Sequence, residues 1–111
     1  MAETLGHLGY DWVLVDLQHG ENNLGNLAPM LTALSATPAV PWVRVVSNDA
    51  ALIQRVLDLG AYGVVVPLVN TAGEAEAAVR AMRYPPKGER SWAPIRGALY
   101  GGADYFAQAE R

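Results

Sequence analysis

Three short apolar runs rich in β-branched residues recur along the chain: Trp12–Val15, Trp42–Val46 and Val64–Val69. Polar residues do not alternate cleanly with apolar ones inside these runs, although Arg44 interrupts the second. Continuous apolar runs of this kind are typical of strands in parallel sheets, which are buried on both faces. We therefore predict three parallel strands with both faces covered.

Apolar residues with helical spacing lie between and after the predicted strands. Each of these stretches starts behind a residue whose side chain can cap a helix. The candidate caps are Asn22 or Asn23, then Asn48 or Asp49, and then Thr71. Glu74 stands three residues after Thr71, which completes the pattern of a capping box. Pro29 offers an alternative first turn for the first helix, a few residues later.

The alternation of helix and strand predicts an α/β fold of repeated βα units. A short helix ends near Gly9, residues 87–100 are expected to form a long loop, and Asp104 is expected to cap a last helix through Ala109. We find no linker and treat residues 1–111 as one domain. Three parallel strands cannot close a (β/α)₈ barrel, which needs about 250 residues. The chain is therefore either a small open sheet or part of a larger barrel.

Composition and charge narrow the classes of function. The 111 residues carry a formal net charge of -3 without a run of Lys or Arg, so no nucleic-acid partner is expected. The chain has no cysteine, which excludes disulfides, a thiolate nucleophile and Cys-based zinc sites. No apolar run approaches the roughly 20 residues that cross a bilayer, and the N-terminus does not resemble a secretory signal. We therefore expect a cytoplasmic protein with no membrane partner.

The residues after the first predicted strand are the first candidates for chemistry. In parallel α/β folds the carboxyl ends of the strands carry the functional groups, and Trp12–Val15 runs directly into Asp16 and His19. A histidine gains and loses a proton near neutral pH. If the chain turns after Leu17, the Asp16 carboxylate can bind one ring nitrogen of His19 and leave the other as a base. A loop histidine without a catalytic role is the alternative.

Arg44 is a charged residue inside an apolar strand. Burying an unpaired charge is costly, so Arg44 is expected to meet an anion. That anion is either a protein carboxylate or a bound carboxylate or enolate, which a guanidinium fork suits. Because Arg44 and Asp16 lie near the ends of consecutive predicted strands, one site can use both.

The other carboxylates do not suggest a metal site. A hard cation such as Mg²⁺ needs several oxygen ligands. Asp49 and Glu74 are expected at helix starts, whereas Asp58 and Glu76 are expected on helix surfaces. The proline-containing segment of residues 84–91 is interpreted as a stiff connection.

Four segments carry a combined family pattern, in order along the chain. They are Gly9–Gly20, Val43–Arg44 with Asn48–Asp49, Gly63–Val69, and the Arg-Tyr-Pro-Pro-x-Gly-x-Arg motif of residues 83–90. Together they resemble the HpcH/HpaI aldolase/citrate lyase family, the metal-dependent (class II) pyruvate aldolases, at its second to fourth barrel strands and the loop that follows. The resemblance implies a (β/α)₈ barrel of the pyruvate/phosphoenolpyruvate type.

The resemblance also implies an activity, the reversible aldol cleavage of 4-hydroxy-2-oxo acids to pyruvate and an aldehyde. The family's pyruvate is chelated to Mg²⁺, Mn²⁺ or Co²⁺, which stabilises the enolate. By position, His19 is implied as the base in proton transfer and Asp16 as the residue that orients it. Arg44 is implied as the residue that holds the pyruvate oxygens and stabilises the enolate. The resemblance further implies that full-length relatives of this chain are homo-oligomeric.

The sequence departs from the family pattern at both ends. The first strand and the later glutamate and aspartate that bind the metal have no counterpart in it. We therefore expect a partial barrel of about three βα units, with catalytic residues but no metal ligands, that is inactive alone. Two alternatives stay open: a citrate-lyase-β-like acyl-CoA lyase, which the Asp-Leu-Gln-His-Gly stretch disfavours, and a non-catalytic module that assembles with a partner chain.

Overall fold

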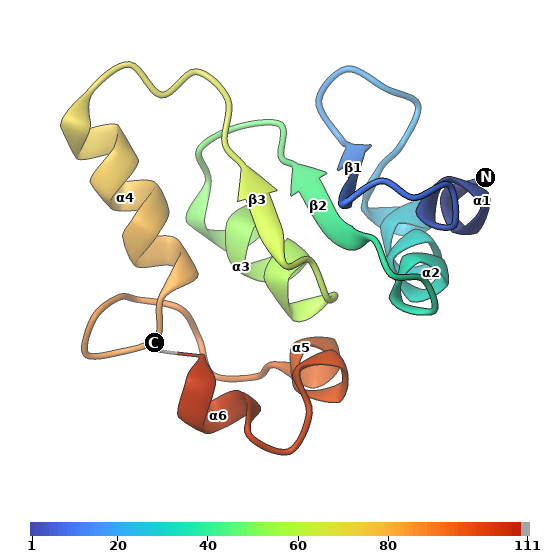
Figure 1. The fold of residues 1–111 in the computed structure, drawn as a ribbon. Helices are drawn as coiled ribbons and strands as arrows, with labels where there is room; N and C mark the ends of the chain where they lie inside the picture. Colours follow the sequence, from blue (N-terminus) through green and yellow to red (C-terminus); the bar gives the residue numbers. More distant parts are fainter. Residues whose placement is uncertain (110–111) are drawn as a thin grey trace.

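A three-stranded parallel sheet with helices packed against one face forms the body of the molecule (Figure 1). The computed structural model describes residues 1–109. The strands β1 (Trp12–Asp16), β2 (Val40–Arg44) and β3 (Gly63–Val65) lie in the order β1-β2-β3. The helices are α1 (Ala2–Gly6), α2 (Leu24–Ser35), α3 (Ala50–Asp58), α4 (Ala72–Met82), α5 (Ile95–Gly101) and α6 (Tyr105–Gln108). The prediction of an α/β fold with three parallel strands is confirmed.

Side-chain caps start the three longest helices, as the sequence predicts. Asn23 accepts a hydrogen bond from the Gly25 amide, and Asp49 accepts one from the Leu52 amide. Thr71 and Glu74 form the expected capping box at the start of α4. Pro29 does not mark a first turn, because it lies inside α2. The alternatives left open by the sequence are thereby resolved to Asn23 and Asp49.

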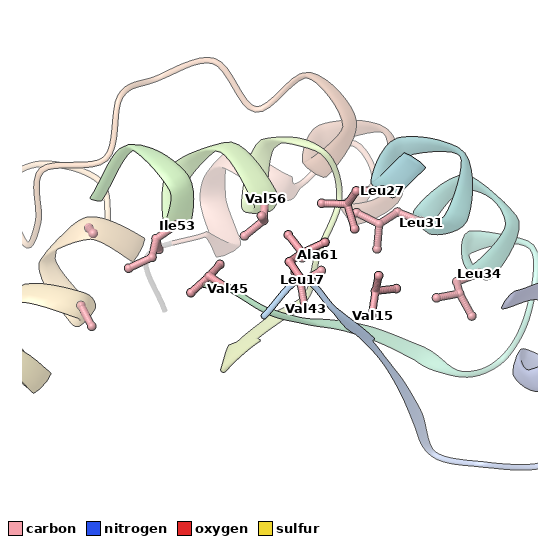
Figure 2. Packing of buried hydrophobic residues seen from close by; sticks show 12 residues of the cluster. Val15, Leu17, Leu27, Leu31, Leu34, Val43, Val45, Ile53, Val56 and Ala61 are labelled. Atoms are coloured by element: carbon pink, nitrogen blue, oxygen red, sulfur yellow. The ribbon is translucent and has the colours of Figure 1, made fainter. Parts of the chain in front are cut away.

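The hydrophobic core lies between the sheet and the helices that cover it (Figure 2). Alternate strand residues point toward opposite faces of a sheet. The residues with odd numbers in β1 and β2 therefore face the helices. The core consists mainly of Val15, Leu17, Val43 and Val45 with Leu27, Leu31 and Leu34 of α2 and Ile53 and Val56 of α3.

Within residues 1–109 the helices cover one face of the sheet, as predicted, and leave the other face largely exposed. Trp12 and Trp42 are 56% and 37% exposed on this face, within residues 1–109, and their ring centroids lie 5.9 Å apart. Trp42 also lies across Gly63, where a Cβ atom would approach the indole to 2.4 Å. The apolar character of this face is what predicted burial on both sides, and among residues 1–109 the cover comes from the helix side.

The first strand matches its predicted run and extends one residue further, to Asp16, whereas the second and third end earlier than predicted. β2 begins at Val40 and ends at Arg44 rather than at Val46, and β3 ends at Val65 rather than at Val69. All three strands stop in one row, Asp16, Arg44 and Val65. Beyond this row Pro67 lacks an N–H group for ladder pairing. The extended chain is also broken at Leu68, whose φ is 57°.

The segment of residues 87–100 is not wholly a loop, because its last part belongs to α5. Two glycines inside this helix obscured its pattern in the sequence. Arg96 and Tyr100 lie one turn apart in α5, and the Arg96 guanidinium donates hydrogen bonds to the Tyr100 hydroxyl at 3.0 and 2.6 Å. Asp104 precedes α6 as expected, but its side chain makes no capping hydrogen bond.

Replacing Thr71 by alanine tests the capping box that starts α4. The variant loses the hydrogen bond from the Glu74 amide to the threonine hydroxyl, so we expect the free energy of unfolding to fall by about 1 kcal/mol. Urea denaturation followed by circular dichroism measures this change. Thr4→Ala is the matched control, because Thr4 is exposed in α1 and caps no helix. Equal stability of the Thr71→Ala variant and the unaltered chain would contradict the assigned cap.

Candidate catalytic site

Asp16 and Arg44 form an ion pair at the carboxyl end of the sheet. They are register partners on β1 and β2, so both side chains leave the sheet on its open face. Arg44 donates from Nε to Asp16 Oδ1 at 2.9 Å and from Nη2 to Asp16 Oδ2 at 2.5 Å. This two-point geometry is the strong form of a guanidinium–carboxylate contact. The anion that the sequence requires for Arg44 is therefore, within this chain, a protein carboxylate.

The same carboxylate shapes the loop that follows β1. Asp16 Oδ1 also accepts hydrogen bonds from the backbone amides of Gln18 at 2.9 Å and His19 at 3.3 Å. An aspartate that binds the amides two and three residues later fixes a tight turn. The Leu17 amide donates to the Arg44 carbonyl at 2.9 Å, so the turn begins directly at the end of the sheet.

His19 lies in this turn with an exposed side chain. Asp16 contacts it through the backbone amide, and no hydrogen bond joins the carboxylate to the imidazole within residues 1–109. The physical reason is that Arg44 and two amides already occupy the Asp16 oxygens. Asp16 therefore positions the chain at His19 rather than the ring. The role of His19 as a base stays a prediction.

The contacts of Asp16 shift its ionisation. Hydrogen bonding to Arg44 holds the pKa of the Asp16 carboxyl well below its usual range, with a smaller contribution in the same direction from the amides of Gln18 and His19. In turn, the hydrogen bonds to Asp16 raise the pKa of Arg44. Both groups stay charged throughout the pH range in which proteins work, so neither is suited to transfer protons.

A second polar network joins the loops that follow β2 and β3. Asn48 Nδ2 donates to the Glu74 carbonyl at 2.8 Å. Glu74 Oε2 accepts from the amides of Asn70 at 2.8 Å and Thr71 at 2.9 Å, and these hydrogen bonds lower the pKa of Glu74. The β2–α3 loop, which follows Arg44 in the chain, is therefore tied by a hydrogen bond to the start of α4.

Sequence reasoning missed a buried ion pair between α3 and the loop after α4. Arg90 is only 6% exposed, and its Nη2 donates to Asp58 Oδ1 at 2.7 Å. The sequence analysis expected Asp58 on a helix surface, but its carboxylate pairs with a buried arginine. The Arg90 guanidinium also lies 4.6 Å from the centre of the Tyr84 ring, and burial raises the pKa of the Tyr84 hydroxyl. The segment after Met82 is thus anchored by charge as well as stiffened by its prolines.

The residues present do not fit a divalent metal. Within residues 1–109 no three His, Cys, Asp or Glu side chains come together in a group that could hold a metal ion. The best-placed carboxylate, Asp16, already accepts hydrogen bonds from Arg44 on both oxygens. Among the same residues no helix is long and apolar enough to cross a membrane.

The ionisation of Asp16 can be measured directly. Its pKa in the folded chain lies below the unfolded value of about 3.9. The ionised pair therefore stabilises the fold above about pH 4, and this contribution is lost as the pH falls through the folded-state pKa. An NMR titration of the carboxyl carbon should show a midpoint well below that of a free aspartate. Arg44→Met should return the midpoint toward the ordinary value; a normal midpoint in the unaltered chain would contradict the pair.

The Asp58–Arg90 pair predicts an asymmetric response to substitution. Asp58→Ala leaves the buried Arg90 charge without its partner, so we expect a loss of about 3 kcal/mol in the free energy of unfolding. The double variant Asp58→Leu with Arg90→Met removes both charges and should lose less. Urea denaturation measures the free energy of unfolding of the unaltered chain, the single variant and the double variant. A double variant less stable than the single one would show that the ion pair itself stabilises the fold.

Comparison with known proteins places this geometry in a family. The family model described as HpcH/HpaI aldolase/citrate lyase matches residues 1–109. A hydroxypyruvate/pyruvate aldolase from Rhizorhabdus wittichii is 45% identical over 108 residues, which cover 97% of this chain and 43% of that protein. A 5-keto-4-deoxy-D-glucarate aldolase from Escherichia coli is 41% identical over 112 residues, covering 99% of this chain and 44% of that protein.

The fold agrees with the sequence comparison. The crystal structure of an HpcH/HpaI aldolase/citrate lyase family protein from Burkholderia cenocepacia superposes with a TM-score of 0.86 at 38% identity, over 97% of this chain and 45% of that one. The expected α/β fold, part of a (β/α)₈ barrel, is confirmed by this match. The chain spans less than half the length of these relatives. The chain belongs to the HpcH/HpaI aldolase/citrate lyase family.

Proposed function

We propose that this chain supplies the proton-transfer and enolate-binding residues of a class II pyruvate aldolase. The reaction is the reversible cleavage of 4-hydroxy-2-oxo acids to pyruvate and an aldehyde. The observation that carries the proposal is the Asp16–Arg44 pair, which fixes a guanidinium at the carboxyl edge of the sheet with His19 in the adjoining turn. The names of the relatives from Rhizorhabdus wittichii and Escherichia coli, both aldolases, support the reaction class.

Arg44 is suited to bind the oxygens of pyruvate and its enolate. Its Nε and Nη2 atoms hold Asp16, whereas Nη1 carries no hydrogen bond among residues 1–109. A guanidinium has five N–H donors, so donors remain for a ligand carboxylate or oxyanion. Because Asp16 fixes the plane of the group before the ligand arrives, little reorganisation is needed when negative charge develops. Asp16 acts through Arg44 and is a positioning residue.

His19 is suited to the proton transfer. In the direction of addition, its imidazole takes a proton from the methyl group of pyruvate, and the C–H electron pair becomes the enolate double bond. The enolate carbon then attacks the aldehyde carbonyl carbon, a C–C bond forms, and the former carbonyl oxygen takes up a proton. Cleavage reverses these steps. The His19 side chain is exposed, so a substrate can reach it.

The metal of the complete enzyme is proposed to be held elsewhere. The family is divalent-metal dependent, and we propose Mg²⁺, Mn²⁺ or Co²⁺ as the ion. The described residues form no metal-binding group, so we place its carboxylate ligands outside residues 1–109, together with the remaining strands of the barrel. Pyruvate and the aldehyde are the proposed small-molecule partners.

A chimera tests the proposal with a complete barrel. This chain replaces its matching segment in the Rhizorhabdus wittichii aldolase, and exchange of the pyruvate methyl protons with deuterium is followed by NMR with Mn²⁺ added. We expect exchange, and we expect His19→Ala to slow it by at least about 100-fold, the lower range for loss of a general base. His7→Ala is the matched control, because His7 is exposed on the segment before β1.

Two results would contradict the proposal. Exchange that survives His19→Ala unchanged would show that another group removes the proton. Metal-dependent exchange by the 111-residue chain alone would show that it holds the metal without further carboxylates.

A further inference from the structure

The loop after β3 presents one apolar side chain in an unusual backbone conformation. Leu68 has a φ of 57° and is the one non-glycine residue with positive φ within residues 1–109. This left-handed region is uncommon for residues other than glycine, asparagine and aspartate. The Leu68 side chain is nevertheless 80% exposed, so its own packing does not hold the backbone in this conformation.

Polar groups around Leu68 hold the loop in place. Asn70 Nδ2 donates to the Leu68 carbonyl at 2.9 Å, and the Asn70 amide is bound by Glu74 Oε2 at 2.8 Å. Asn48, from the loop after β2, donates to the Glu74 carbonyl. The conformation of Leu68 is thus fixed by α4 and by the neighbouring loop.

The leucine side chain is not needed for this loop conformation. A glycine would adopt the same φ without the clash that a Cβ atom causes. Residues that their surroundings hold in a strained backbone conformation cluster at active sites and ligand-binding loops. Leucine at this position therefore presents an apolar side chain that residues 1–109 leave largely uncovered.

Leu68 lies in a loop at the carboxyl edge of the sheet. Val65, the last residue of β3, is the register partner of Arg44, and the Val45 amide donates to the Val65 carbonyl. Leu68 follows Val65 by three positions, in the loop at the carboxyl edge where the loops after β1 and β2 also lie (Figure 1). This is the edge that carries the ion pair of Asp16 and Arg44.

We propose that Leu68 is a specificity-determining residue that contacts the carbon chain of the aldehyde. This inference rests on the proposed function, in which Arg44 binds the pyruvate half of the product. An exposed apolar side chain at the same edge of the sheet favours an aldehyde with an alkyl chain over one with hydroxyl groups, because a hydroxyl in contact with it would lose water without gaining a hydrogen-bond partner.

The test compares two aldehydes in the chimera that carries this chain. The ratio of kcat/KM for butanal to that for glycolaldehyde is measured with pyruvate as the donor. Leu68→Asn and Leu68→Gly both suit a left-handed backbone and remove the apolar side chain, so we expect the ratio to fall about tenfold, the low end for one apolar contact. Leu68→Met keeps an apolar side chain and should keep the ratio. Leu99→Asn, which alters an exposed leucine in α5, is the matched control and should also keep it.

Methyl-proton exchange of pyruvate, which needs no aldehyde, separates this inference from the function on which it rests. Exchange in the chimera with an unchanged ratio in Leu68→Asn and Leu68→Gly would overturn the role of Leu68 while leaving the aldolase function intact. An equal fall in the ratio for Leu68→Met would also overturn it, because the loop backbone rather than the apolar side chain would then set the preference. Absence of exchange before any substitution would overturn both.

Discussion

The pairing register between β1 and β2 is the constraint on which the site depends. It places Asp16 opposite Arg44 in the last row of the sheet, on the face that the helices leave open. A shift of one residue would turn one member of the pair toward Val15 and Val43 in the core. The hydrophobic core and the ion pair therefore specify the same register, and the turn that carries His19 is built on the result.

Much of the fold could be predicted because its signals are local. Apolar runs mark the strands, and Thr71 with Glu74 marks the start of α4, since each signal involves neighbours in sequence. Burial on both faces could not be read from the runs, because Trp12 and Trp42 are apolar whether or not something covers them. The ends of the strands also depend on partners: β3 stops at Val65, although four further residues of the run were assigned to it from the sequence.

The candidate site likewise has features that could be predicted from the sequence and features that could not. The positions of Asp16 and Arg44 at the ends of consecutive strands indicated one shared site, and the structure brings them together. The sequence suggested a hydrogen bond from Asp16 to the His19 ring, but the carboxylate binds Arg44 and backbone amides instead. Which donors win one carboxylate depends on the tertiary structure. The pair of Asp58 with Arg90 joins residues far apart in sequence, and neither position departs from an ordinary helix or loop pattern. Only the folded chain reveals it.

The contact between Trp42 and Gly63 has a consequence for the dynamics of the sheet. Because the indole occupies the space of a side chain at position 63, β3 must carry a glycine, which weakens a strand. This strand is also the shortest of the three within residues 1–109, and it shares three register positions with β2 where β1 shares five. Local opening starts in elements with few paired groups. Within residues 1–109 we therefore expect the pairing of β3 with β2 to open, and to exchange its amide protons, before the pairing of β1 with β2 that holds the charged row.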